Sequence, residues 1–140
     1  MDFMKKSKFI ILVLLIFILN LIWEFSHYKL YIDLTDIPSN IHLILASFVD
    51  LLLVSFIFFI NSVIKKSINW IENTKKSDYV IIVILSLLIA TAIEIYSIAH
   101  NRWLYTESMP TIFGIGISPL IQLFTTAIIS IKLLNFFNKR

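Results

Sequence analysis

Three acidic residues of this 140-residue chain lie inside long apolar stretches: Glu24, Asp50 and Glu94. An ionisable group at the centre of a lipid bilayer costs about 3 kcal/mol to insert, so such residues normally face a protein interior or a wet cavity. Carboxyl groups in that setting can move protons as general acids and bases, or they can capture a cation. The chemistry that these residues indicate is therefore proton transfer or cation binding within a membrane.

Other polar or small residues recur at helical spacing around the acids, and each apolar stretch carries one such stripe. The stripes are Asn20, Glu24 and His27; Ala46, Ser47, Asp50 and Val54; Ala90, Thr91, Glu94, Ser97 and Asn101; and Ser118, Gln122, Thr125 and Thr126. In a four-helix bundle the stripes can turn inward together, which predicts a polar pocket near the outer face. Its candidate catalytic residues are Glu24, His27 and Glu94, and its candidate substrate-binding residues are Asn20, Asp50, Asn101, Arg102 and Gln122.

The elements that position these residues must be membrane helices. Hydrophobic residues make up 59% of the chain and charged residues 15%, and the mean hydropathy is +0.89, far from the values of a soluble domain. Two glycines and three prolines supply too few turns for a membrane β-barrel. The lack of cysteine excludes disulfides, thiol nucleophiles and thiolate metal sites.

The apolar runs predict one all-α domain over residues 1–140, a polytopic membrane protein with four transmembrane helices. The spans are expected at about residues 9–28, 41–65, 79–100 and 119–137. At about 1.5 Å per residue, each is long enough to cross a hydrocarbon core about 30 Å thick.

Local signals refine the ends of the last two helices. Ser77 and Asp78 are typical capping residues before the third span, and Ser118 followed by Pro119 is typical of a helix start. Residues 111–117 contain both glycines and are therefore expected to be irregular.

The positions of the cations predict the topology. Ten of the twelve Lys and Arg residues lie at the N-terminus, in the middle connection or in the C-terminal part, and only Lys29 and Arg102 lie in the two other connections. By the positive-inside rule both termini are cytoplasmic, and Trp70 is expected at headgroup level on that side. An aromatic belt is expected at the opposite interface: Tyr28, Tyr31, Trp103 and Tyr105. Topology also explains the net charge of +3, so no nucleic-acid partner is expected.

The buried acids can also be interpreted in two plainer ways. Polar side chains can join membrane helices by hydrogen bonds without any further role. Glu24 and His27 also have the spacing of a metal-binding helix pair, but Ser97 stands where a second pair would need histidine. The metal arrangement that remains is a mononuclear site of Glu24, His27, Asp50 and Glu94. We expect neither a metal nor another cofactor.

Several strings of residues resemble those of a family of small, uncharacterised bacterial four-span membrane proteins. They are Trp-Glu-x-x-His-x-x-Leu-Tyr from Trp23 to Tyr31, Ala-Ser-Phe-Val-Asp from Ala46 to Asp50, Arg-Trp-x-Tyr-x-x-x-Met-Pro from Arg102 to Pro110, and Gly-x-Ser-Pro-Leu-x-Gln from Gly116 to Gln122. The resemblance covers nearly the whole chain. It implies a multi-pass protein of the bacterial cytoplasmic membrane in which these positions form one unit, and it implies no activity. In architecture alone, the chain is similar to the four-span domain shared by emopamil-binding sterol isomerases and the sigma-2 receptor, which places acids within its helices over a lipid-like ligand.

Two functions of different classes follow from the polar pocket. The first is an enzyme that acts on a lipid or isoprenoid-like substrate by acid–base chemistry, with Glu24 and Glu94 handling the proton and His27 as their partner. The alternative is a non-catalytic module that binds or transports a cation, an amine or a proton, or a purely structural membrane protein. Membrane lipids and a lipid-like or cationic small molecule are the expected partners, and transport would require a homo-oligomer.

Overall fold

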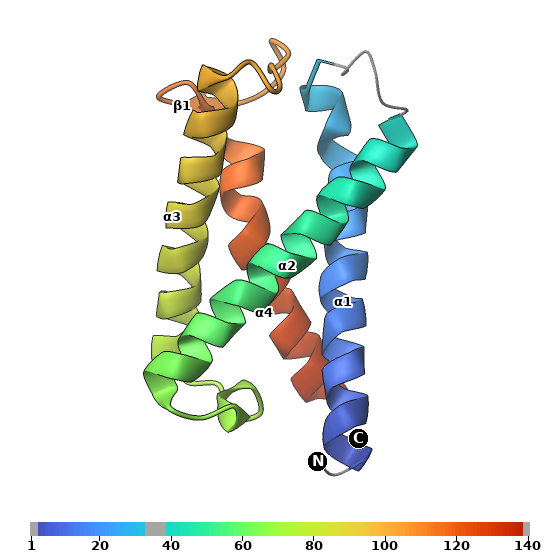
Figure 1. Ribbon diagram of the computed structural model, residues 1–140, viewed down its shortest axis with the longest axis vertical. Coiled ribbons are helices and arrows are strands. Elements are labelled where there is room, and N and C mark those ends of the chain that lie inside the picture. Colours follow the sequence, from blue (N-terminus) through green and yellow to red (C-terminus); the bar gives the residue numbers. More distant parts are fainter. Residues whose placement is uncertain (1–2, 33–38, 139–140) are drawn as a thin grey trace.

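The computed structural model describes residues 3–32 and 39–138 and contains four long helices joined by short connections (Figure 1). The helices are α1 Phe3–His27, α2 Ser39–Lys65, α3 Lys76–Ala99 and α4 Ile117–Phe137. All four are long and apolar enough to cross a membrane, which confirms the predicted all-α bundle of four membrane helices. Shorter elements lie in the connections: the 3-10 turns η1 Tyr28–Leu30 and η2 Asn69–Ile71, and the strands β1 Thr111–Ile112 and β2 Ile115–Gly116.

The helices do not pack equally along their lengths. α1 packs along α2 and α4, and α3 packs along α4. α2 crosses obliquely from the foot of α3 to the head of α1, so α2 and α3 diverge toward one end of the molecule (Figure 1). We call that end the aromatic end, because it holds Tyr31, Trp103 and Tyr105, and the opposite one the lysine end, because it holds Lys65 and Lys75.

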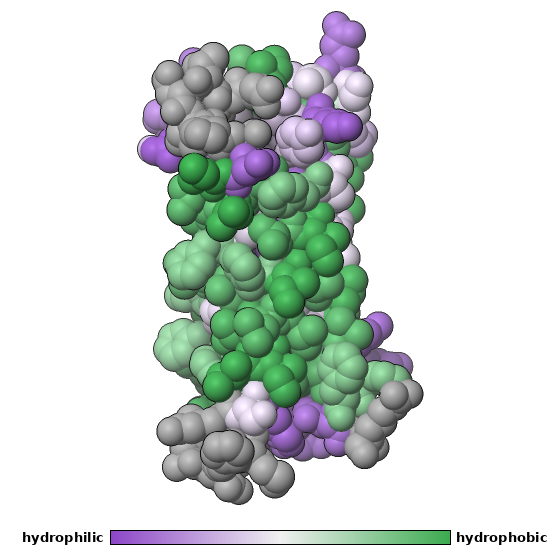
Figure 2. Space-filling view, turned by 90° about the vertical axis from the view of Figure 1, so that its right-hand side faces the viewer, coloured by the Kyte–Doolittle hydropathy of each residue, from purple (hydrophilic) through white to green (hydrophobic). Residues whose placement is uncertain are grey.

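The surface and the core both fit a bilayer-spanning bundle. Figure 2 shows a face that is apolar between two polar ends, the pattern of a protein that crosses a membrane. Inside, an isoleucine from each helix is at most 1% exposed, and the four belong to one packed cluster: Ile16, Ile57, Ile82 and Ile131. Ile57, Ile82 and Ile131 lie in the halves of their helices nearer the lysine end, and Ile16 lies near the middle of α1. That half of the bundle is therefore a close-packed apolar core.

The connection between α2 and α3 folds back onto the lysine end. Trp70 is 5% exposed, its ring centroid lies 5.5 Å from that of Phe58, and its indole N–H donates to Ser62 Oγ at 2.8 Å. This indole finds an apolar neighbour and an acceptor inside the protein, and its depth relative to the headgroups stays a prediction.

Asp78 organises the start of α3 at the same end and is 1% exposed. Its carboxylate accepts the backbone N–H of Lys75 at 2.7 Å and the side-chain amide of Asn61 at 3.3 Å, and it pairs with Lys65 at 2.9 Å. Because α3 begins at Lys76, Asp78 caps the helix from within its first turn and not from the residue before it.

A short hairpin precedes α4 at the aromatic end. β1 and β2 pair antiparallel across Phe113 and Gly114, whose φ values of 51° and 80° suit a two-residue hairpin turn. α4 then begins one residue before the predicted start, Ser118. The prediction that Ser118 is the N-cap is wrong: Gly116 takes that position because it ends β2 with an extended backbone, and Ser118 Oγ instead accepts the indole N–H of Trp23 at 3.3 Å.

Two connections, residues 28–32 and residues 102–106, meet over the aromatic end. An antiparallel bridge and two backbone N–H···O bonds, both 2.9 Å long, join them. We call these two segments the lid. Because successive side chains of an extended segment point to opposite faces, Trp103 and Tyr105 can turn toward the bundle while Leu104 is 50% exposed.

Candidate functional site

A cavity of about 1000 Å³ lies under the lid, in the half of the bundle nearer the aromatic end. Side chains of α1 and α4 line its back, and side chains of α2 and α3 flank it. All three intramembrane acids reach it, together with His27 and Gln122. The shared cavity predicted for Glu24 and Glu94 is therefore present, although no direct hydrogen bond joins these two described carboxyl groups.

The amide of Gln122 on α4 holds two of the acids together. Its Nε2 lies 2.8 Å from Glu24 Oε1 and 2.7 Å from Asp50 Oδ2. An amide nitrogen carries two hydrogens, so each carboxyl group can receive one. Behind it, Oδ1 of the buried Asn20 lies 3.3 Å from the same nitrogen and accepts the Thr126 hydroxyl at 3.2 Å. Asn20 thus supports Gln122 from behind and does not line the cavity.

Glu24 and Asp50 thus meet at one amide nitrogen, and we call them the carboxyl pair. Two ionised carboxyl groups on one amide nitrogen repel each other, which favours a shared proton or a bound cation between them. Among the side chains that the structure describes, no lysine or arginine forms an ion pair with either of them or with Glu94. The carboxyl pair is therefore available to hold a proton or a cation.

Glu94 is 4% exposed and is held from above by donors from the lid. Its Oε2 accepts the indole N–H of Trp103 at 3.2 Å and the hydroxyl of Tyr105. The Tyr105 oxygen in turn accepts the backbone N–H of Gly116 at 3.0 Å, which directs the phenol hydrogen to Glu94. Burial raises the pKa of the Tyr105 phenol, so this side chain remains a donor well above neutral pH. Oε2 of Glu94 is consequently organised as a hydrogen-bond acceptor.

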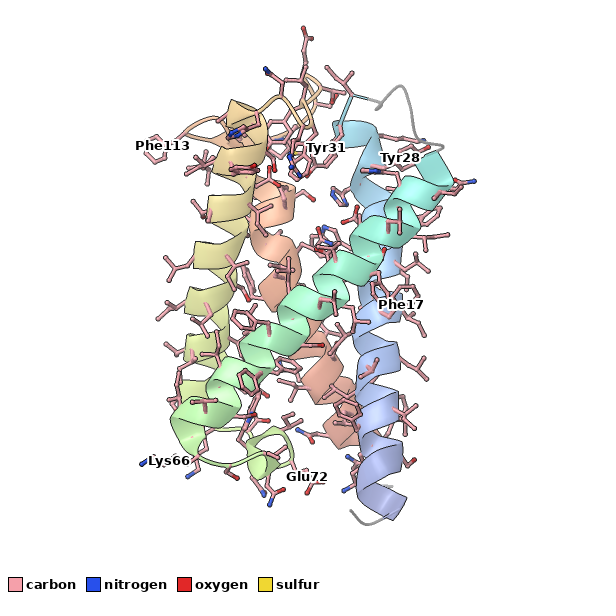
Figure 3. All side chains as sticks on the ribbon, in the orientation of Figure 1. Phe17, Tyr28, Tyr31, Lys66, Glu72 and Phe113 are labelled. Atoms are coloured by element: carbon pink, nitrogen blue, oxygen red, sulfur yellow. The ribbon has the colours of Figure 1, made fainter. Side chains whose placement is uncertain are left out.

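Tyr31 lines the same cavity as the carboxyl pair and Glu94. Figure 3 shows it at the aromatic end, above the space between α1 and α3, whereas Phe113 points away from the bundle. Its ring centroid is 5.4 Å from that of His27 and 5.6 Å from that of Tyr105. Burial raises the pKa of the Tyr31 phenol, and the charges of the three acids raise it further. The Tyr31 side chain lines the cavity, and its hydroxyl has no hydrogen-bond partner among the described residues.

Tyr31, Trp103 and Tyr105 were predicted to form an interfacial belt. Their place around the cavity, and the hydrogen bonds of Trp103 and Tyr105 to Glu94, were not predicted. The signal that could have found two of them is the alternation of Trp103, Leu104 and Tyr105. A period of two puts both rings on one face of an extended segment, opposite an apolar residue that faces outward.

His27 lines the cavity and is 7% exposed. Its Nδ1 lies 2.7 Å from the backbone oxygen of Trp23. A carbonyl oxygen can only accept, so Nδ1 carries a hydrogen and Nε2 is left to serve as the second polar atom of the ring. His27 therefore has a defined orientation beside Tyr31, with one nitrogen committed to the helix backbone.

Arg102 and Asn101 were both predicted to bind substrate, and the structure separates them. Arg102 lines the cavity, with its guanidinium 5.3 Å from the ring centroid of Tyr96. Asn101 is exposed and does not line it. Its φ is 51°, its N–H donates to Ile98 O at 3.1 Å, and the next N–H donates to Ser97 O at 2.9 Å, which is the Schellman ending of a helix. The placement of Asn101 among the pocket residues is therefore wrong: it ends α3.

Within the described residues, no group of three or more His, Asp or Glu side chains is arranged to hold a metal ion. Comparison of the chain with protein-family models, with curated proteins and with solved structures found no match. The family resemblance of the motifs stays a prediction, and the function rests on the chemistry of the cavity.

Proposed function

We propose that the protein is a membrane enzyme that isomerises an unsaturated, isoprenoid-like lipid by acid–base chemistry. The carboxyl pair is the acid and Glu94 is the base. The observation that carries this proposal is the juxtaposition of Glu24 and Asp50 on one amide nitrogen, with no basic side chain paired to them among the described residues. Two carboxyl groups that share a proton supply a general acid, and a carboxylate held by two hydrogen-bond donors supplies a general base. The different surroundings of the carboxyl pair and of Glu94 thus assign them different roles.

The proposed reaction begins when the carboxyl pair gives its proton to one carbon of a carbon–carbon double bond. The neighbouring carbon becomes a carbocation, and the rings of Tyr31, Trp103 and Tyr105 attract its charge as they would attract any cation. Glu94 then removes a proton from a carbon next to the cationic centre, and the electrons of that C–H bond form a new double bond. Substrate and product are isomers, so the reaction consumes no oxidant, reductant or cofactor.

The enzyme returns to its starting state when the proton on Glu94 passes back to the carboxyl pair. We assign this step to the hydroxyl of Tyr31, because Tyr31 lines the same cavity as both groups and its hydroxyl has no hydrogen-bond partner among the described residues. It can give its hydrogen to the carboxyl pair and take one from Glu94. His27, whose Nε2 is not committed to the backbone, orients Tyr31 through their ring contact.

Deuterium exchange tests this proposal on a mixture of lipids, so the substrate need not be identified first. Proteoliposomes that contain an extract of bacterial isoprenoid lipids are incubated in D₂O, and the lipids are analysed by mass spectrometry. Because the carboxyl pair exchanges its proton with solvent, at least one lipid should gain carbon-bound deuterium with the wild-type protein and not with Glu24→Gln. If the wild-type protein adds deuterium to no lipid of the extract, the isomerase proposal fails.

A second candidate, binding of an amine, is favoured by one specific observation: three acids share a cavity and none has an ion-pair partner among the described side chains. Carboxylates beside aromatic rings are the usual recognition chemistry for an ammonium group. Saturable binding of dodecylamine that is lost in Glu24→Gln, without deuterium incorporation in any lipid, would favour this candidate over the enzyme.

We place both termini in the cytoplasm and the aromatic end at the outer face of a bacterial cytoplasmic membrane, because ten of twelve cations lie on the other side. The chain has no cysteine, so single cysteines are unique labels. An impermeant thiol reagent added to intact cells should modify Ser108→Cys and spare Ser67→Cys. The reverse pattern would reject this orientation.

A further inference from the structure

The cavity reaches the molecular surface between α2 and α3. On both helices, some of the side chains that line it are also about half exposed: Leu45 is 56% exposed and Val49 53% on α2, and Tyr96 is 51% exposed on α3. The side chains that line it from α1 and α4 include Glu24, His27 and Gln122, which form its polar back. The opening therefore lies on the side of the bundle where α2 diverges from α3 (Figure 1).

This opening is apolar and lies within the membrane-spanning helices. Ala46 and Val49 border it on α2, and Ala92 and Ile93 border it on α3. A surface of this kind at bilayer depth is in contact with hydrocarbon chains and not with water. The small side chains of Ala46 and Ala92 leave room between the two helices.

The lid covers the cavity from the aqueous side at the aromatic end. Its two segments are tied by backbone hydrogen bonds, and Tyr31, Trp103 and Tyr105 stack edge to face beneath them. Toward the other end the buried isoleucine cluster of all four helices is packed together. The apolar opening between α2 and α3 is therefore the route into the cavity that faces the hydrocarbon core.

We infer that the molecule acted upon enters from the bilayer, between α2 and α3, and is therefore a membrane-dissolved hydrocarbon chain and not a water-borne metabolite. This inference rests on the proposed function for the chemistry that follows entry. The double bond reaches the acids at the back of the cavity, while the rest of the chain remains between the two helices, in contact with lipid.

A cysteine inside the cavity reports the route of entry. Ala90 lines the cavity and is 5% exposed, so Ala90→Cys places a single thiol there with little change in volume. The protein in liposomes is treated either with pyrenylmaleimide, which dissolves in the bilayer, or with sulfonatoethyl methanethiosulfonate, which stays in water. Each rate is normalised to that of the exposed Ser108→Cys with the same reagent. Lateral entry predicts labelling of Ala90→Cys by the first reagent and little by the second.

Blocking the opening provides the matched test. Ala46→Trp or Ala92→Trp, each combined with Ala90→Cys, should remove most of the pyrenylmaleimide labelling, from either side of the opening. Ala99→Trp adds the same bulk at an exposed position of α3 outside the cavity lining and should leave labelling unchanged. Labelling by the sulfonate reagent at a comparable normalised rate, or no effect of both tryptophans, would overturn the lateral route. The labelling experiment needs no turnover, so it remains valid even if the isomerase proposal fails. If labelling contradicts lateral entry while deuterium incorporation is intact, only the route of entry is rejected.

Discussion

Two parts of the bundle bury carboxyl groups, and they satisfy them differently. At the lysine end, Asp78 accepts a backbone N–H and a side-chain amide and pairs with the ammonium group of Lys65. Its charge is therefore balanced by a cation of the protein itself. At the aromatic end, Glu24, Asp50 and Glu94 receive only neutral donors from amide, indole and phenol groups of the described residues. Asp78 thus has a cationic partner, whereas the three acids at the aromatic end have no lysine or arginine paired with them among the described side chains.

The surroundings sharpen this contrast. Asp78 lies where the chain turns between two helices, and its contacts cap α3 and tie it to α2. The other three acids border open space that reaches the membrane side of the molecule. A buried carboxyl with its own cation serves the fold, and removing either partner is costly. Carboxyl groups that face a cavity without a cation are available to a proton or to a ligand.

The largest effect is expected from Glu24→Gln and Glu94→Gln, which keep hydrogen-bonding capacity but remove the acid or the base. Deuterium incorporation should fall about 10²- to 10⁴-fold, the usual contribution of a positioned acid or base. The unfolding midpoint in detergent should change little, since neither carboxyl has an ion-pair partner to lose among the described residues. Glu72→Gln, which removes an exposed acid paired with Lys8, is the control. If the two glutamines lower stability and leave incorporation intact, the acids serve the fold, as Asp78 does.

Asp50→Asn should have an effect only slightly smaller. The carboxyl group of Asp50 and that of Glu24 contact the same amide nitrogen, and in the proposed reaction the two act together as the acid. We expect a loss of about 10²-fold or more in deuterium incorporation, because the acid is the pair and not either residue alone. A variant with near wild-type incorporation would show that Glu24 works without its neighbour.

The periodic part of the site could be predicted from the sequence. Glu24, Asp50, Glu94 and Gln122 lie in long regular helices, where spacing decides which face a residue occupies, and inward-facing stripes must meet in a small bundle. The packing of α2 against α1 brings Asp50 near Glu24. It depends on the angle at which the two helices cross, which the spacing of residues along the sequence does not reveal.

The aromatic residues could not be sorted in this way. Trp and Tyr gather at membrane interfaces whatever their role, so Tyr31, Trp70 and Tyr105 carry the same signal in sequence. Their functions differ only through contacts between segments far apart in the chain, such as the bridge between Tyr31 and Tyr105. The prediction that Asn101 belongs to the pocket depended on extending the helical stripe past Ala99. α3 ends at Ala99, so the helical periodicity no longer applies at Asn101.

Replacing Asp78 should affect stability and not chemistry. Asp78→Ala removes the cap of α3, leaves Asn61 and the Lys75 N–H without this acceptor, and leaves Lys65 without its ion-pair partner. We therefore expect a loss of about 2–3 kcal/mol in the free energy of unfolding. Asp78→Asn keeps an acceptor oxygen for the cap and should lose less. Unfolding by denaturant in detergent measures both, and the folded fraction should still incorporate deuterium at the wild-type rate. A loss of incorporation at unchanged stability would remove the distinction between the two ends.

The smallest effect is expected from Asn101→Gly, and it tests where the site stops. Asn101 adopts φ 51°, a conformation that glycine reaches without strain and asparagine tolerates better than most residues. The free energy of unfolding should therefore change by less than about 0.5 kcal/mol, and deuterium incorporation should be unchanged because the side chain is outside the cavity. Asn101→Val is the matched control: a β-branched residue at this φ should cost about 1–2 kcal/mol, again without a specific loss of activity. If Asn101→Gly lowers incorporation while stability holds, the amide contributes to the reaction, and the site extends beyond the end of α3 to the polar surface above it.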